Sequence, residues 1–265
     1  MRNGILAGLF LLVGVSAVSQ ADEWRKQFAV SAKPEVAVEM NDGNIRVRSS
    51  DQPQVQATVL TRGWKVSPSD VRVDARQSGN RIDIEVHVPH MTFSWGNRSV
   101  DLELVVPRES DLMLNTKDGN VTLDGVRGTE KVHSGDGNIE ARRLDGAVTV
   151  STGDGNINLD GRFDLLDANT GDGNIDAEAA GASKMSTAWT LRTGDGNIRL
   201  RVPSSFSADL DAETGDGTVS VEFPVTVSGR QEENKLRAPI NGGGPTLRLR
   251  TGDGQIRIEK GGAGI

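Results

Sequence analysis

Eight aspartates recur in one short phrase along the chain, and carboxylates at a fixed spacing are candidate cation ligands. The commonest form of the phrase is Gly-Asp-Gly-Asn-Ile, and four of its aspartates follow one another at intervals of 18 residues. The eight are Asp42, Asp118, Asp136, Asp154, Asp172, Asp195, Asp216 and Asp253. If the repeats stack, neighbouring carboxylates lie about 5 Å apart and repel each other, so something must offset the repulsion.

Two explanations can account for this aspartate row. In the first, Asp136, Asp154 and Asp172 are metal ligands, with calcium held between stacked turns as in repeat-in-toxin β-rolls. In the second, each carboxylate accepts N–H groups of its own turn and water screens the rest. The phrase lacks the Gly-Gly-x-Gly-x-Asp spacing of the calcium roll, so we expect no cofactor and keep calcium as the alternative.

The asparagine of each phrase has a structural explanation, because stacked amides donate and accept hydrogen bonds along a stack. This row comprises Asn120, Asn138, Asn156, Asn174 and Asn197.

Tryptophan offers a second kind of binding chemistry. Trp95 and Trp189 are the candidates for ligand contact, because an exposed indole on a flat flank can stack on a sugar. Packing under a cap or loop is the alternative for both, and we favour it.

Catalytic motifs are missing from the sequence. There is no Gly-x-Ser-x-Gly, no His-Glu-x-x-His and no phosphate loop before a helix. His87 and His90 lack a third ligand at a useful spacing, so we expect an exposed strand end there, and we expect His133 to be solvated. Inserts at 179–189 and 229–244 are the places where a catalytic cleft could form. We therefore predict no enzyme activity.

The elements that position these residues follow from one repeat, residues 147–161. Apolar and polar residues alternate on both sides of Gly153-Asp154-Gly155-Asn156, which predicts two strands joined by a tight corner. A second corner is expected at Asp-Gly pairs such as Asp145-Gly146 and Asp160-Gly161.

Stacking would bury the apolar face that a single repeat cannot bury alone. One inward row would comprise Val121, Ile139, Ile157, Ile175 and Ile198, and the next Leu123, Ala141, Leu159, Ala177 and Leu200. The fold class predicted is all-β: a single-stack β-solenoid with coils of about 18 residues. An antiparallel sandwich of hairpins is the alternative, because Asp-Gly and Asn-Gly are also hairpin turns.

The period is lost near the N-terminus. The alternating segments 71–75 and 82–88 around Gly79-Asn80 predict an antiparallel hairpin. We expect an antiparallel β meander over 52–107 that acts as an N-terminal cap, because an uncovered end would invite pairing between chains.

The first 21 residues have the pattern of an export signal. Arg2 precedes an apolar run, and Ser19 and Ala21 are small residues at the positions that a signal peptidase recognises. The predicted parts are 1–21 signal peptide, 22–110 first coil and meander, 111–260 repeats, and 261–265 glycine-rich tail. An uncleaved anchor is the alternative to cleavage; no membrane span is expected after cleavage.

The bulk composition limits the partners. The formal net charge is −7, and removing the predicted signal with its Arg2 makes it −8, which argues against nucleic acid. There is no cysteine, so no disulfide stabilises the chain. The oligomeric state stays open.

Taken as a series, the phrases resemble a known family. The motifs that carry the resemblance are the early Asn-Asp-Gly-Asn-Ile at 41–45, Val106-Pro107, the serial repeats, Phe223-Pro224-Val225 and Gly242-Gly-Gly-Pro245. Over about residues 30–260 the chain looks like the putative-adhesin β-strand-repeat family of bacterial envelope proteins, a domain of unknown function. The resemblance implies a β-solenoid in the periplasm or at the cell surface.

From these observations we expect an exported, non-catalytic, adhesin-like binding or scaffold module of the cell envelope. It would lie in the periplasm, on the cell surface or outside the cell. Its partner would be an envelope polysaccharide or a surface protein. The alternatives are a polysaccharide-acting β-helix enzyme and a calcium-stabilised β-roll surface protein.

Overall fold

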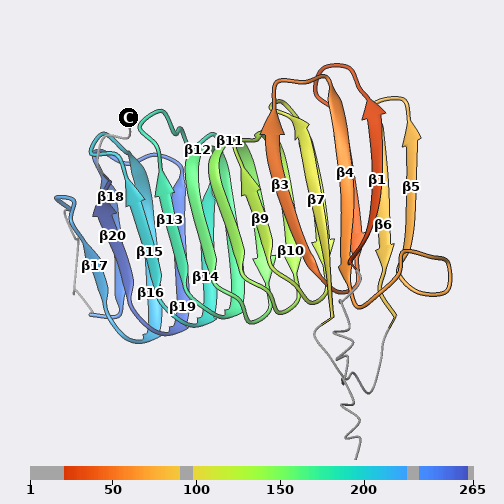
Figure 1. The fold of residues 1–265 in the computed structure, drawn as a ribbon. Helices are drawn as coiled ribbons and strands as arrows, with labels where there is room; N and C mark the ends of the chain where they lie inside the picture. Colours follow the sequence, from red (N-terminus) through yellow and green to blue (C-terminus); the bar gives the residue numbers. More distant parts are fainter. Residues whose placement is uncertain (1–20, 90–97, 226–232, 262–265) are drawn as a thin grey trace, which may run out of the picture.

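The chain forms strands and no helix within the residues that the structure describes. The structure, a computed structural model, describes residues 21–89, 98–225 and 233–261. These residues contain 20 strands (Figure 1), and most strands alternate buried and exposed side chains. The all-β prediction is therefore confirmed. Among these residues there is no helix long and apolar enough to cross a membrane.

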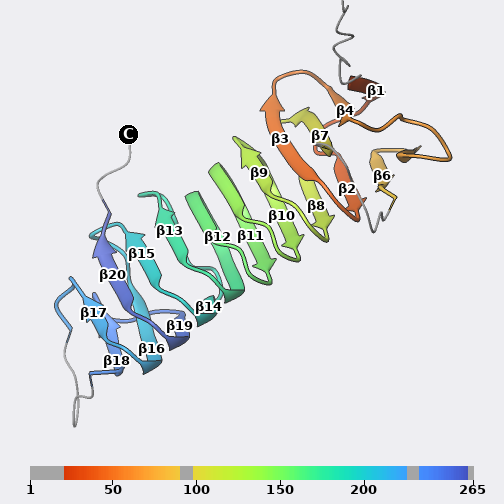
Figure 2. The same ribbon diagram turned by 60° about the horizontal axis from the view of Figure 1, so that its bottom comes forward.

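The strands pair in two rows that face each other along the length of the molecule (Figure 2). β11 and β12 bend and contribute to both rows, so that all strands form one sheet. Row 1 is, in spatial order, β5 (Arg72–Ser78), β6 (Arg81–His87), β2 (Glu35–Met40), β8 (Asp111–Thr116), β10 (Arg127–Ser134), β11 (Ile139–Thr152), β12 (Ile157–Asp172), β14 (Trp189–Asp195), β19 (Thr246–Asp253), β16 (Ala208–Asp216) and β18 (Lys235–Ile240). Row 2 is β1 (Ala21–Ala29), β4 (Gln54–Arg62), β7 (Ser99–Pro107), β3 (Asn44–Ser50), β9 (Val121–Asp124), β11, β12, β13 (Ile175–Ala179), β15 (Ile198–Val202), β20 (Ile256–Lys260) and β17 (Val219–Val221).

Parallel pairing stacks each repeat of the chain on the one before it. Val132 pairs with Val150, and Ile139 pairs with Ile157, each 18 residues further on. The Gly-Asp-Gly-Asn phrase turns the chain from row 1 into row 2, and we call one such passage a coil. The second corner is not a break: β11 continues through Gly146, with shifts of register on either side of the bend.

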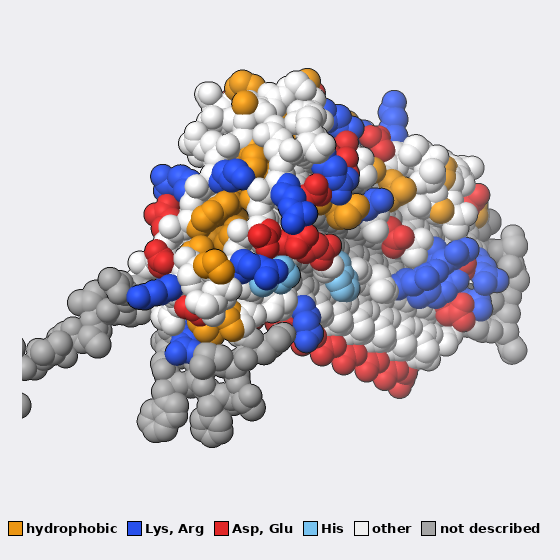
Figure 3. Space-filling view, turned by 90° about the vertical axis from the view of Figure 1, so that its right-hand side faces the viewer, with side chains coloured by type: hydrophobic (Ala, Val, Ile, Leu, Met, Phe, Trp, Pro, Cys, Tyr) orange, Lys and Arg blue, Asp and Glu red, His pale blue; other side chains and the backbone are white. Residues whose placement is uncertain are grey.

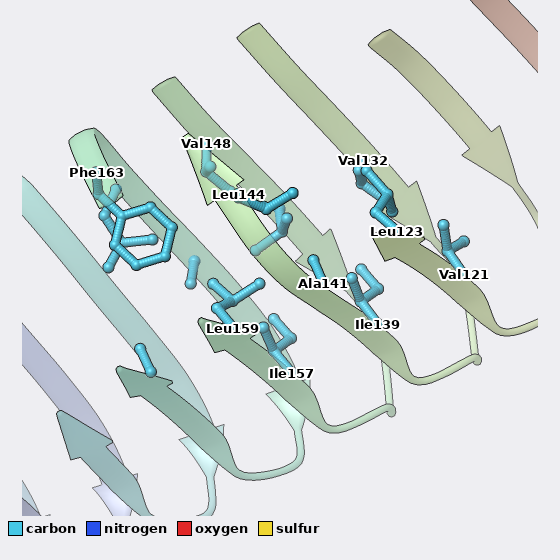
Figure 4. Packing of buried hydrophobic residues seen from close by; sticks show 14 of the residues in the cluster. Val121, Leu123, Val132, Ile139, Ala141, Leu144, Val148, Ile157, Leu159 and Phe163 are labelled. Atoms are coloured by element: carbon cyan, nitrogen blue, oxygen red, sulfur yellow. The ribbon is translucent and has the colours of Figure 1, made fainter. Parts of the chain in front are cut away.

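The core lies between the two rows. Both predicted inward rows are confirmed, because strand register places their members side by side and all of them are buried. Figure 4 shows Val121, Ile139 and Ile157 following one another from coil to coil, with Leu123, Ala141 and Leu159 beside them.

Both ends of the stack depart from chain order. The coil β19–β20 lies between the coils β14–β15 and β16–β17, although it comes last in the chain. At the other end, β2 and β3 lie between the pair β6 and β7 and the pair β8 and β9. The long interval between Asp216 and Asp253 contains β17, the antiparallel β18 and β19.

The expected antiparallel meander over 52–107 is corrected by the strand pairing. The predicted hairpin is present as β5 and β6. However, β6 and β7 pair parallel to β2 and β3, and continue the stack of coils. Only β4, β1 and β5 are antiparallel to their neighbours at this end. Parallel pairing of β6 and β7 is favoured over an antiparallel meander because it extends the inward apolar rows of the repeats.

Candidate functional site

The asparagines of the corners form a ladder, as predicted. The Oδ1 of Asn138 accepts the backbone N–H of Asn156 at 2.8 Å and its Nδ2 at 3.2 Å. The same two bonds link each asparagine to the next, and the backbone N–H of Gln255 donates to Asn197 Oδ1, so the ladder extends beyond the predicted row at both ends. Its members are Asn44, Asn120, Asn138, Asn156, Asn174, Asn197 and Gln255. These amides hold the coils together and are committed to structure.

Buried hydroxyls close the inside of the corners. Thr152 Oγ1 donates to the carbonyl of Gly137 at 2.8 Å, and Thr170 Oγ1 donates to that of Gly155 at 2.8 Å. A Cβ on Gly137 would lie 1.8 Å from the carbonyl oxygen of Gly119. Close approach of neighbouring coils, rather than a positive φ, is what requires glycine at Gly137.

The eight aspartates form one continuous row on the outside of the corners. Register aligns Asp172 with Asp195, Asp195 with Asp253, and Asp253 with Asp216. A line of acidic side chains follows the lower edge of the molecule in Figure 3. The candidate ligands Asp136, Asp154 and Asp172 are exposed. Within the described chain, the one set of three His, Asp or Glu side chains with ligand atoms within 4.8 Å of one another contains none of them.

Trp189 is buried, which excludes ligand contact and agrees with the packing that its sequence context favoured. Its side chain has no exposed surface and packs edge-on against Phe163 and tilted against Phe206, with ring centroids 6.1 and 5.4 Å away. Its indole N–H donates to the carbonyl of Asp164 at 3.4 Å. A ring buried in this way cannot stack on a ligand, so packing under the insert is its role. Trp95 lies outside the described residues.

The histidines lie apart. His133 is exposed on row 1, and its Nδ1 lies 2.9 Å from the Oγ of Ser151 on the next coil. His87 ends β6, and His90 lies outside the described residues.

Three adjoining hollows cross the outer face of row 2, and together they form the most extended candidate site. Their volumes are about 300, 350 and 380 Å³. Glu140 and Arg142 line both the first and the second, and Asp176 lines both the second and the third. We call this surface the row 2 groove; it runs from β3 to β20 across the middle coils.

Ion pairs fill the end of the groove near β15. Arg201 bridges Asp176 at 2.8 Å and Glu178 at 3.0 Å. Arg199 lies 3.4 Å from Asp176 and 3.7 Å from Glu259. These side chains alternate along and across the strands, so they offer both donors and acceptors to a ligand.

The other end of the groove is richer in arginine. Arg142 pairs with Glu140, and Arg143 pairs with Asp124. Arg46 and Arg48 line the same hollow from β3. The sequence analysis did not predict the row 2 groove. Its residues occupy outward positions of successive coils, so aligning the repeats in stacking order would have brought them together.

A hollow lies beside the first insert, one of the two places where a cleft could form. This hollow of about 220 Å³ is lined by Gly181, Ser183, Lys184, Met185, Pro203, Ser205, Phe206, Ser207 and Pro245, and contains no carboxylate. Residues 229–232 of the second insert lie outside the described residues, and the rest forms β18 and its turn.

One acidic residue points into the core and was also missed. Glu130 is fully buried, in register with Leu112 and Val148. Neither of its carboxyl oxygens has a hydrogen-bond partner among the described residues. Burial, with the nearby Asp111 as a second cause, raises the pKa of Glu130 to about 8.

Comparison with known proteins gives a family. The family model Toastrack DUF4097 matches residues 35–259. No curated protein matches the chain.

The solved structures that match the chain share little sequence with it. The "putative cell adhesion protein" of Clostridium sporogenes is 14% identical, covers 91% of this chain and 100% of its own, and has a TM-score of 0.46. The "putative adhesin" of Bacteroides fragilis is 14% identical, with coverage of 89% and 96% and a TM-score of 0.44. The "putative lipid binding protein" of Parabacteroides distasonis is 14% identical, with coverage of 91% and 98% and a TM-score of 0.41. Because the family model spans most of its length, this chain belongs to the Toastrack family, as the resemblance of its repeats predicted.

Proposed function

We propose that this protein is a non-catalytic, adhesin-like binding module of the bacterial cell envelope, and that its row 2 groove holds an extended polysaccharide. The observation that carries the proposal is the continuity of the three hollows: Glu140 and Arg142 line both the first and the second, and Asp176 lines both the second and the third. A groove that crosses successive coils fits a linear polymer better than a compact ligand. In this proposal the coils act as a single-stack β-solenoid that presents the groove.

The charges of the groove favour a polar polymer rather than nucleic acid. Carboxylates and guanidinium groups are interspersed, as around Arg201, so no single-sign field develops. Nucleic acid needs a basic face. Sugar hydroxyls both donate and accept hydrogen bonds, and paired charges of both signs can serve them.

Binding to purified envelope polysaccharides would test the groove. We expect the Arg142→Ala/Arg201→Ala variant to bind at least about tenfold more weakly, because hydrogen bonds to charged groups contribute about 1.5–3 kcal/mol each. Arg192→Ala is the matched control, since Arg192 is an exposed arginine on row 1. Equal loss in the control, or unchanged binding in the double variant, would remove the groove from the proposal.

The same proposal places the protein outside the cytoplasm. The predicted signal, residues 1–21, supports export to the periplasm, the surface or the medium. N-terminal sequencing of the exported protein should begin at Asp22. A chain that keeps its first residues would instead be anchored.

We propose that the protein lacks catalytic activity. The hollow at the first insert has no carboxylate to act as a general acid, which polysaccharide hydrolysis requires. A reducing-end assay across the polysaccharides that bind should stay at background.

A further inference from the structure

The outer face of the hairpin β5–β6 brings two carboxylates and an imidazole together. Asp74 and Glu85 are direct partners across the hairpin. His87 lies two residues beyond Glu85 and therefore on the same face of the strand. One ligand atom of each residue lies within 4.8 Å of the others, and His87 Nε2 lies 3.5 Å from Glu85 Oε2.

The sequence conceals this group, because its members are joined by strand pairing rather than by spacing. Near His87 in the sequence, His90 is the one other histidine, and no third ligand follows at a useful spacing. The missing ligands come from the cross-strand partner and from the residue two places earlier on β6.

Negative charge accumulates at this place. Like charges directly opposite each other destabilise an antiparallel pair, and Glu39 on β2 continues the row as the register partner of Glu85. Arg72 offsets part of the charge, with its Nε 2.8 Å from Asp74 Oδ2. Arg81 is already paired with Glu35 and Asp83. Among the described residues, Arg72 is thus the one arginine or lysine paired with the group.

The mixture of ligand atoms indicates the class of cation. Zn²⁺ accepts both imidazole nitrogen and carboxylate oxygen, whereas Ca²⁺ and Mg²⁺ prefer oxygen alone. Three protein ligands would leave a coordination position for water or for an external ligand. Glu85 and His87 are exposed, so their side chains are free to rotate toward a shared ion.

We propose that Asp74, Glu85 and His87 bind one divalent transition-metal ion of the zinc class, and that the ion displaces Arg72 from Asp74. The site lies on row 1 near the N-terminal end of the stack, away from the row 2 groove, and is independent of the proposed polysaccharide binding. Because the ligands come from both strands, the ion would tie β5 to β6.

Calorimetric titration of the purified protein with Zn²⁺ tests the site. We expect one ion per chain. His87→Ala, Asp74→Asn and Glu85→Gln should each weaken binding by about tenfold or more, since even outer-shell changes at metal sites cost about 10–100-fold. Arg72→Gln should strengthen binding, because it removes the cation that competes for Asp74. Ca²⁺ and Mg²⁺ should bind much more weakly than Zn²⁺.

Two variants serve as controls. His133→Ala removes the other described exposed histidine, and Glu39→Gln removes the adjacent carboxylate, which is held by the Nδ2 of Asn115 at 2.8 Å. His133→Ala should keep the affinity of the unaltered protein, and Glu39→Gln, which removes a nearby charge but no ligand, should weaken binding less than any of the three ligand variants. Circular dichroism should show every variant folded. The proposal is overturned if no zinc binds at millimolar concentration, if His87→Ala binds normally, if His133→Ala loses the ion, or if Arg72→Gln weakens binding.

Discussion

Glu130 is the residue at which the pattern of the core breaks. Its neighbours in the inward row, Leu112 and Val148, are apolar, and it is held in the protonated form by burial. The raised pKa has a defined consequence for stability. Between pH 4.5 and about 8 the folded chain keeps the proton and the unfolded chain releases it, so the free energy of unfolding falls as pH rises.

Glu130→Gln should remove this dependence. In the unaltered protein the free energy of unfolding falls by about 1.4 kcal/mol per pH unit, which amounts to roughly 5 kcal/mol between pH 4.5 and about 8; the variant should lose this fall. Urea unfolding at pH 5, 6.5 and 8 should therefore show the variant close to the unaltered protein at pH 5 and increasingly more stable at higher pH. Glu109→Gln, at an exposed carboxylate, is the control and should leave the slope unchanged. Parallel pH profiles for the unaltered protein and Glu130→Gln would mean that the buried carboxyl is ionised throughout.

The burial of single residues was predictable wherever the repeat phase could be counted. Ile157 and its row follow from the period of 18 and are fully buried. Side chains two residues apart on a strand point to the same face. Trp189 lies four residues before the buried Thr193, and Glu130 lies four residues before the buried Ser134, so both are placed inward as well. Residue type left both packing and ligand contact open for Trp189, and its phase in the repeat decides between them. The partners of His87 could not be found in this way, because they depend on the register of a non-repeating hairpin.

At the scale of elements, the corners combine an inner row of hydroxyls, an amide ladder and an outer row of carboxylates. The first two were open to prediction because stacking dictates them. The role of the aspartates was not, since the sequence does not show how the carboxylates are oriented. Their exposure favours screening by water and salt over a bound ion.

We expect calcium to leave the melting temperature unchanged. In a His87→Ala background, which removes the proposed zinc site, EGTA should give no shift and added sodium chloride a small rise. Neighbouring carboxylates about 5 Å apart lie within one Debye length, so salt screens their repulsion. Thermal melts of this protein and of Asp136→Asn/Asp154→Asn/Asp172→Asn measure both effects. A large rise with calcium that the triple change abolishes would instead establish the aspartate row as a calcium site.

At the scale of the whole molecule, the ends of the stack carry residues that discourage pairing with other chains. β1 presents Glu23, Arg25 and Lys26, and β18 contains Pro239. Charge and proline on edge strands are familiar protections against edge-to-edge association. The sequence predicted that the ends need protection, but not which strands would supply it, because the end coils depart from chain order.

Removal of the last coil should disturb more than the residues removed. A chain that stops after Gly244 lacks β19 and β20, which separate β14 and β15 from β16 and β17. Hydrogen exchange should then show loss of protection in β16 and β18 as well, because their support is gone. A chain that stops after Lys260 is the control and should exchange normally. Full protection of β16 in the shorter chain would mean that β16 moves into the vacated place.

The inserted last coil also determines when the protein can finish folding. A simple stack could close one coil at a time as its residues become free. Here β16 and β17 are synthesised before the coil on which they rest. β16 can already pair with β18, but β17 has no partner strand until β20 follows. The coil β16–β17 therefore cannot be completed until β19 and β20 have been synthesised, although the earlier coils can already be ordered. Completion of the fold becomes a single late event that requires the C-terminal segment, and an interrupted chain is left with an exposed edge that proteases can recognise.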